Sequence, residues 1–87
     1  MSRQRSMDAI QAAEYVTIGE LARLTDVRYS TLKFYTEEGM ISFRQPEKNL
    51  TRRYKREEAV ARVFEIKKTR AEGKSVPEIR EMLAFRK

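Results

Sequence analysis

Two short amphipathic segments, separated by a few residues, occupy the second quarter of the sequence. The first begins at Thr17, and Glu20 three residues later completes the spacing of a helix-starting capping box. Apolar side chains follow at helical intervals, with Ile18 and Leu21 on one face. The pattern predicts a helix of about two turns that ends near residues 25–26.

The second segment, residues 29–38, places Leu32 and Tyr35 on one face, where they would pack against the first helix. Gly39 follows, and glycine is the residue that most readily adopts the left-handed conformation ending a helix. Two helices this close in sequence must cross at a steep angle. The pair therefore predicts a helix-turn-helix.

A basic hairpin is predicted next. Residues 42–44 alternate polar and apolar side chains, residues 45–49 supply turn formers, and residues 51–54 would form the return strand. Two more helices follow, over about residues 56–72 and from Ser75 onward, the second with a capping-box glutamate at Glu78. The apolar residues expected in the core of this part are Phe43, Val60, Val63, Phe64, Ile66, Ile79, Met82 and Leu83.

The N-terminal residues 1–14 show no sustained hydrophobic period and no clear helix cap, so we expect a flexible tail there. Residues 15–17 are aromatic and β-branched, which favours a brief extended segment. The expected domain is residues 15–87. Its predicted fold class is mainly α with a small β-hairpin wing, a winged helix-turn-helix with four helices.

The amino-acid composition excludes several kinds of functional site. The 87 residues include no cysteine and no histidine, which removes disulfides, thiolate metal sites and the usual acid–base relay residues. We therefore expect no enzyme activity and no cofactor or metal. No apolar run has the length of a membrane span, and no secretion signal is evident, so a soluble, cytoplasmic protein is expected.

The net charge of +6 is unevenly distributed. Residues 1–27 carry three basic and four acidic side chains, residues 28–56 carry eight and three, and residues 57–87 carry eight and six. The positive excess therefore lies in the block of residues 28–56, which spans the second predicted helix and the hairpin. A concentrated basic segment is typical of nucleic-acid binding, although a solvated basic surface that keeps proteins apart gives the same pattern.

The order of these motifs resembles the N-terminal DNA-binding region of the MerR family over roughly residues 15–84. The segments that carry the resemblance are TIGELARLTDV, TLKFYTEEGMI, a basic hairpin with RRY, EEAVARV and GKSVPEIREML. The resemblance implies a bacterial, nucleoid-associated transcription regulator that binds double-stranded promoter DNA as a dimer and acts with RNA polymerase. Lys33 and Phe34 replace the arginine and tyrosine of the family pattern, which removes a planar guanidinium fork and a hydroxyl.

Candidate DNA contacts follow from the helix, the hairpin and the resemblance. Arg28, Tyr29 and Ser30 begin the second helix, which we expect in the major groove, and are the candidates for base edges. Lys33 and Tyr35 are candidates for phosphate, and Arg52 on the wing is a candidate for the DNA backbone or the minor groove. The structural alternatives are a solvated turn residue for Arg28 and an exposed edge charge for Arg52. The full candidate set is Thr17, Arg28, Tyr29, Ser30, Thr31, Lys33, Phe34, Tyr35, Arg44, Lys48, Arg52, Arg53 and Tyr54.

Two other functions remain open from the sequence. An excisionase-like or architectural protein would use the same fold to assemble cooperatively on repeated DNA sites. A protein-interaction module would instead present the basic face to an acidic partner. The chain shows neither the long dimerisation helix nor the effector domain of the family, so we expect a monomer or a weak dimer in solution, with a dimer or multimer forming on DNA.

Overall fold

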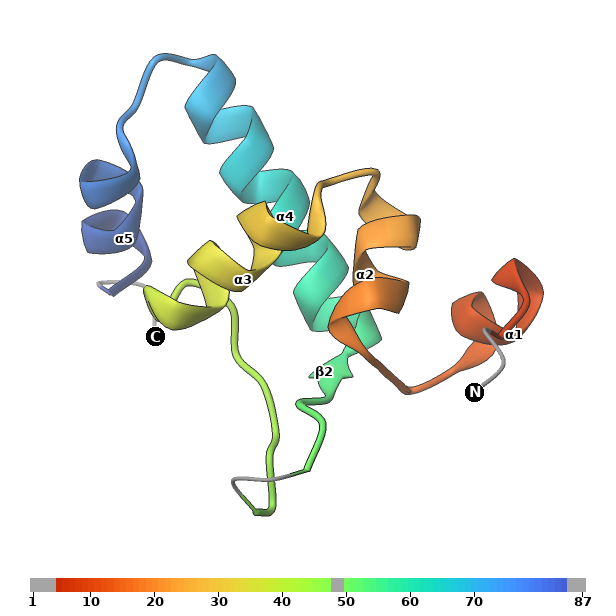
Figure 1. Cartoon of the computed structure of the whole chain (residues 1–87). Helices are drawn as coiled ribbons and strands as arrows, with labels where there is room; N and C mark the ends of the chain where they lie inside the picture. Colours follow the sequence, from red (N-terminus) through yellow and green to blue (C-terminus); the bar gives the residue numbers. More distant parts are fainter. Residues whose placement is uncertain (1–4, 48–49, 85–87) are drawn as a thin grey trace.

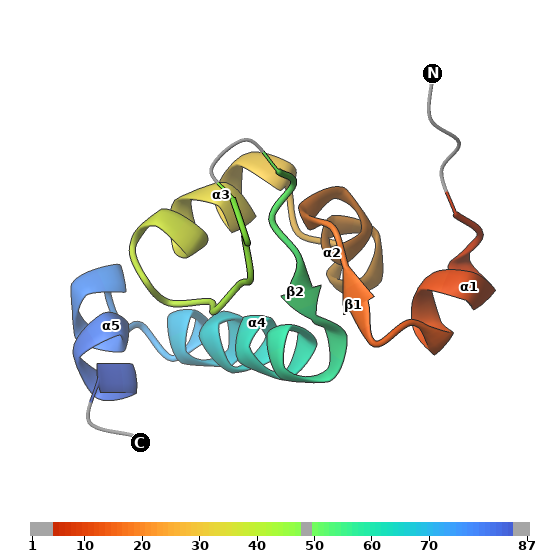
Figure 2. The ribbon, with the colours of Figure 1, turned by 90° about the horizontal axis from the view of Figure 1, so that it is seen from below.

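The longest helix of the described residues, α4 (Arg56–Ala71), packs against two other helices and a strand (Figures 1 and 2). The computed structural model describes residues 5–47 and 50–84. Within them the elements, in order, are α1 (Met7–Ala12), β1 (Tyr15–Val16), α2 (Ile18–Thr25), α3 (Tyr29–Glu37), β2 (Tyr54–Lys55), α4 (Arg56–Ala71) and α5 (Val76–Ala84). The predicted winged helix-turn-helix is confirmed as the fold class, with five helices in the described residues rather than four.

Helix α2 begins and ends as its sequence predicts. The Thr17 backbone N–H donates to a Glu20 carboxylate oxygen at 2.9 Å, and the Glu20 N–H donates to the Thr17 hydroxyl at 3.2 Å. This capping box satisfies two backbone groups at the helix start. The helix ends at Asp26, which adopts a left-handed conformation with φ of 56° and turns the chain toward α3.

Helix α3 turns one apolar face toward the body of the molecule. Leu32 and Tyr35 are buried, as predicted, together with Thr36. Gly39 follows the helix with φ of 77°, in the left-handed region where a Cβ atom would be unfavourable. Met40 and the residue after it then return to the core.

The wing differs from the hairpin predicted by sequence. The predicted strands over residues 42–44 and 51–54 meet in a single antiparallel bridge, between Arg44 and Arg53. The strand that does form, β2, pairs with β1 instead, with Val16 opposite Tyr54. The reason is burial: Val16 and Tyr54 are both enclosed in the core, whereas the sides of the wing have no apolar layer to cover.

Helix α4 buries Ala59, Val63 and Ile66, and α5 buries Ile79. The α5 capping box is confirmed, since the Ser75 N–H donates to Glu78 at 2.9 Å and the Glu78 N–H donates back to the Ser75 hydroxyl at 3.3 Å. The prediction of a core position is wrong for Phe43, Phe64 and Met82, which are all exposed. Helical spacing places a residue on a face, but it does not show how much of that face another element covers.

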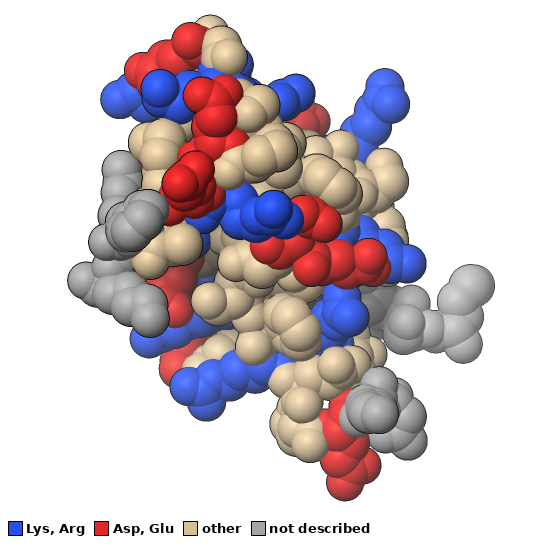
Figure 3. All heavy atoms as spheres, turned by 90° about the vertical axis from the view of Figure 1, so that its left-hand side faces the viewer, with Lys and Arg blue, Asp and Glu red and all other residues tan. Residues whose placement is uncertain are grey.

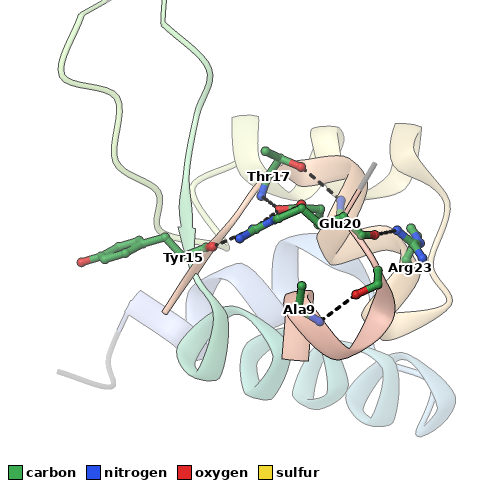
Figure 4. Close-up of polar contacts among 7 residues, drawn as sticks. Ala9, Tyr15, Thr17, Glu20 and Arg23 are labelled. Carbon is green, nitrogen blue, oxygen red and sulfur yellow. Dashed lines mark hydrogen bonds and ion pairs between the residues drawn. The ribbon is translucent and has the colours of Figure 1, made fainter. Parts of the chain in front are cut away.

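The prediction of a stretch without regular structure at the N-terminus is wrong for residues 7–12, which form α1. Ser6 caps this helix by accepting a hydrogen bond from the Ala9 N–H at 3.2 Å (Figure 4). Ile10 is fully buried. A helix of six residues is too short to show a hydrophobic period in the sequence. Its single buried side chain is what attaches it to the core.

Candidate nucleic-acid interface

The outer surface of α3 and its N-cap presents five of the thirteen residues expected to contact DNA. Arg28, Ser30 and Lys33 are exposed, and Tyr29 and Phe34 keep 56% and 46% of their surface accessible. Arg28 occupies the N-cap position but makes no capping hydrogen bond with its side chain. Its guanidinium group is therefore available to a ligand at the start of the helix.

The inner residues of α3 hold the helix against the wing. The Thr36 hydroxyl donates to the Leu32 carbonyl at 2.8 Å, and it also lies 2.9 Å from the Tyr54 hydroxyl. Because the single Thr36 proton is used on Leu32, the Tyr54 hydroxyl must be the donor in the second bond. This buried pair connects the last turn of α3 to β2, at the base of the wing.

Burial separates Phe34, Tyr35 and Tyr54, three of the four predicted aromatic contacts on α3 and β2. Tyr54 has no accessible surface, so its side chain supports the wing and is not accessible to a ligand. Tyr35 is largely enclosed, with its ring centroid 6.0 Å from that of Phe34. Phe34 alone of the three faces outward. Thr31 is half-buried beside it.

Two arginines of the wing lie over aromatic rings. The Arg52 guanidinium is 4.7 Å from the centroid of Phe43, and that of Arg44 is 5.5 Å from the centroid of Tyr15. Stacking of this kind occupies the flat face of the guanidinium and leaves the N–H groups at its edge free to bind. The exposed Phe43, predicted as core, thus serves as a platform for Arg52.

Five cations of α3 and the wing lack acidic partners within the part of the chain that the structure describes. Among the described residues the structure contains no ion pair for Arg28, Lys33, Arg44, Arg52 or Arg53. Figure 2 shows α3 and the wing on the same side of α4. The arrangement therefore gathers unpaired positive charge from two separate segments on one side of the molecule. Lys48 lies outside the described residues.

The side of the molecule that carries α5 and the end of α3 differs in its distribution of charge. Figure 3 shows acidic and basic side chains intermixed there, without one dominant sign. One pair on these elements joins Arg80 of α5 to Glu38, the residue after α3. This side offers less attraction to a polyanion than the surface formed by α3 and the wing.

Thr17, another predicted contact, is half-buried at the start of α2 and is committed to the capping box. Arg5 approaches the same helix end and binds both carboxylate oxygens of Glu20 at 2.6 Å (Figure 4). It also donates to the Tyr15 carbonyl, while Arg23 donates to the Arg5 carbonyl at 2.7 Å. The Arg5 guanidinium, with help from the backbone of Thr17, lowers the pKa of Glu20 to about 2.

One residue near the interface was missed by sequence analysis. Arg70, in the last turn of α4, lines a hollow of about 280 Å³ together with Ser30, Thr31 and Phe34 of α3. In the sequence, a basic residue in the last turn of a helix is explained by the helix dipole alone. Only the packing of α4 across α3 brings it to this position.

Within residues 5–47 and 50–84, no helix has the length and apolar character needed to cross a membrane. The same residues contain no group of three or more acidic side chains placed to hold a metal ion.

Comparison with known protein families gives one match. The model of the family described as MerR HTH family regulatory protein matches residues 16–85, which include every element from α2 to α5. No curated protein and no solved structure gives a significant match.

Proposed function

The chain belongs to the MerR HTH family of regulatory proteins, and from that premise we propose that it binds double-stranded DNA at specific sequences, with α3 in the major groove and the wing on the backbone. Membership makes it a DNA-binding domain of transcription regulation, in a family of regulators and not of enzymes. The proposal concerns the docking mode. Promoter-like sites and RNA polymerase are the targets and partner that the family suggests for this chain.

The observation that carries the proposal is the set of five cations without acidic partners on α3 and the wing. A duplex presents two rows of phosphates on either side of a groove. Cations on a helix and on a separate loop can meet both rows at once, and each phosphate neutralised releases counterions.

Positions along α3 suggest a division of roles. Arg28, Tyr29 and Ser30 lie at the start of the helix, the part that enters deepest when a recognition helix docks in the major groove. An arginine there can bind a guanine edge with two hydrogen bonds. Lys33, one turn later, and Arg52, on the wing, offer charge to the backbone and carry no sequence information.

Alanine variants test this division. Lys33→Ala and Arg52→Ala should weaken binding to specific and random duplexes alike, and each should lower the salt slope by about one. Arg28→Ala should lose about 1–3 kcal/mol on the preferred site and leave random DNA almost unaffected. Lys68→Ala provides a matched control, because Lys68 is exposed on the side of α4 opposite the buried Ile66.

Fluorescence anisotropy with a selected site and a scrambled duplex, each at two salt concentrations, measures all four variants. An unchanged ratio of specific to random affinity in Arg28→Ala would show that the start of α3 does not read the bases. An equal loss in Lys68→Ala would show that binding is spread over the whole basic surface. Strongly cooperative filling of tandem sites would favour the architectural function over the regulator.

A further inference from the structure

Among the exposed residues of α3, all of which the structure describes, Phe34 alone carries no polar group. It keeps 46% of its surface accessible on a helix that otherwise presents cations and hydroxyls to a ligand. A phenyl ring cannot neutralise a phosphate, so it adds nothing to the electrostatic attraction of DNA. A single exposed apolar residue is ordinary on a protein surface, and its surroundings therefore decide what it can bind.

Phe34 borders the hollow of about 280 Å³ beside α3. Three helices contribute to this hollow: α3, the last turn of α4 and the start of α5. Its lining residues are Ser30, Thr31, Phe34, Tyr35, Arg70 and Val76. A space of only about 10–15 Å³ admits a group the size of a water molecule, so a methyl group fits here easily. The hollow thus combines an apolar wall with hydrogen-bonding groups.

The Phe34 ring is supported by its neighbour in the chain. Its centroid lies 6.0 Å from that of Tyr35, and the two ring planes are tilted by 51°, an arrangement that aromatic pairs favour. Tyr35 is itself largely enclosed in the core. A ring held in this way presents a fixed apolar surface, so a ligand that packs on it has little side-chain freedom to remove.

Ser30 lies one helical turn before Phe34 and borders the same hollow. Residues four apart emerge next to each other on one face of a helix, with their Cβ atoms about 5–6 Å apart. The Ser30 hydroxyl can donate a hydrogen bond, whereas the Phe34 ring offers apolar contact alone. Together they place a hydrogen-bond donor and an apolar surface side by side on α3.

Thymine is the base whose major-groove edge matches this pair of groups. It presents the O4 acceptor next to the C5-methyl group, and the other three bases of ordinary DNA have no methyl group there. An apolar side chain gains contact area from the methyl group. Against another base it would instead cover polar groups and leave them without a hydrogen-bond partner.

We propose that Phe34 determines sequence specificity by packing on the 5-methyl group of a thymine, while Ser30 donates a hydrogen bond to O4 of the same base. This role rests on the proposed function, since it requires α3 to lie in the major groove. Phe34 is about 9 Å beyond Arg28 along the helix, and stacked bases are about 3.4 Å apart. The thymine should therefore lie within about three base pairs of the guanine that Arg28 binds.

Replacement of thymine by uracil tests the methyl contact, because it removes the methyl group and keeps both O4 and the base pair. Uracil is placed at each thymine of the selected site in turn, and affinity is measured by competition at one salt concentration. At one position the wild-type protein should bind about fourfold more weakly, which is the effect of burying one methyl-sized group at about 0.8 kcal/mol. At that position 5-methylcytosine should bind about fourfold more tightly than cytosine.

Variants of the protein assign the preference to Phe34. Phe34→Ala should bind the thymine and uracil duplexes equally, whereas Phe34→Leu keeps an apolar side chain and should keep most of the preference. Ser30→Ala should weaken binding of both duplexes by the same factor. Phe64→Ala is the matched control: Phe64 keeps 48% of its surface exposed but lies on α4 and does not line the hollow, so this variant should retain the wild-type preference.

A thymine preference that Phe34→Ala loses and Phe64→Ala keeps would support the role of Phe34. A selected site in which no thymine is sensitive to uracil would overturn it, as would a preference that Phe34→Ala retains, and in both cases the proposed function would stand. The absence of any preferred site would reject the proposed function and this role with it. The uracil scan with wild-type protein needs no variant, so it decides the matter even if Phe34→Ala does not fold.

Discussion

The buried hydrogen bond between Tyr54 and Thr36 should couple the wing to the recognition helix, and its removal should be measurable as lost stability. Both side chains are enclosed, and the two oxygens lie 2.9 Å apart. Tyr54→Phe removes the donor but leaves the Thr36 hydroxyl bonded to the Leu32 carbonyl. The expected loss is therefore the ordinary contribution of one hydrogen bond, about 1 kcal/mol.

Thr36→Val is expected to cost more, because it leaves the Tyr54 hydroxyl buried without an acceptor. A buried unsatisfied group costs about 1–3 kcal/mol. The double variant should lose less than the sum of the two single losses, by about 1 kcal/mol, since the second change removes a group that has already lost its partner. Thr36→Ser retains the hydroxyl and should keep the coupling.

Urea unfolding of the wild type, the single variants and the double variant gives all the free energies from one set of curves. Each kcal/mol should also lower the melting temperature by about 4–8 °C in a domain of this size. Losses that add to within about 0.3 kcal/mol would refute the reasoning, since the two hydroxyls would then not be acting on each other. Tyr54→Phe should also weaken DNA binding, because this hydrogen bond helps to hold the wing in position. Binding at the wild-type level would show that the wing keeps its position without the bond.

Three further predictions concern stability. Glu20→Gln should lower the free energy of unfolding by about 1–2 kcal/mol at pH 7, a value reduced for the exposure of Arg5. Because the native pKa of Glu20 is lowered to about 2, its contribution is present above its ordinary pKa of 4.5 and is lost as the pH falls toward 2. The free energies of unfolding of the two proteins should therefore converge near pH 2. Gly39→Ala should cost about 1 kcal/mol because φ is positive, whereas Gly19→Ala, inside α2 with room for a Cβ, should be stabilising in the same melting assay. Ile10→Ala should cost about 2–4 kcal/mol in urea unfolding, a loss that a detached tail would not show.

The parts of the fold predicted correctly are those encoded by near neighbours in sequence. The capping boxes at Thr17 and Ser75 depend on side chains three residues apart, and both form. Gly39 ends α3 for an equally local reason. Helix starts and stops of this kind can be recognised without knowing what the helix packs against.

The parts predicted incorrectly depend on distant contacts. The pairing of Val16 with Tyr54 joins segments far apart in the chain, so the strand pattern of the wing could not reveal it. Phe64 has the spacing of a core residue, but no described element covers its side of α4. Which face of a helix is covered is a property of the assembled fold and not of the helical period.

In the candidate interface, too, some features could be predicted from the sequence and others depend on the assembled fold. The exposed cations of α3 and the wing could be named from charge and motif order. By contrast, the burial of Tyr54 and the stacking of Arg52 on Phe43 could not be predicted from the sequence, since both depend on the folded position of the wing. Arg70 joins the hollow beside Ser30 only through the crossing of α4 and α3.

The salt dependence of duplex DNA binding tests the central claim most directly. If the five unpaired cations of α3 and the wing meet phosphates or bases, the logarithm of the binding constant should fall with the logarithm of salt concentration. At about 0.9 per phosphate neutralised, the slope should reach about −3 to −4.5, and a selected site should bind more tightly than a scrambled one at every salt concentration. A slope near zero, or equal affinity for both duplexes, would contradict sequence-specific DNA binding by this surface.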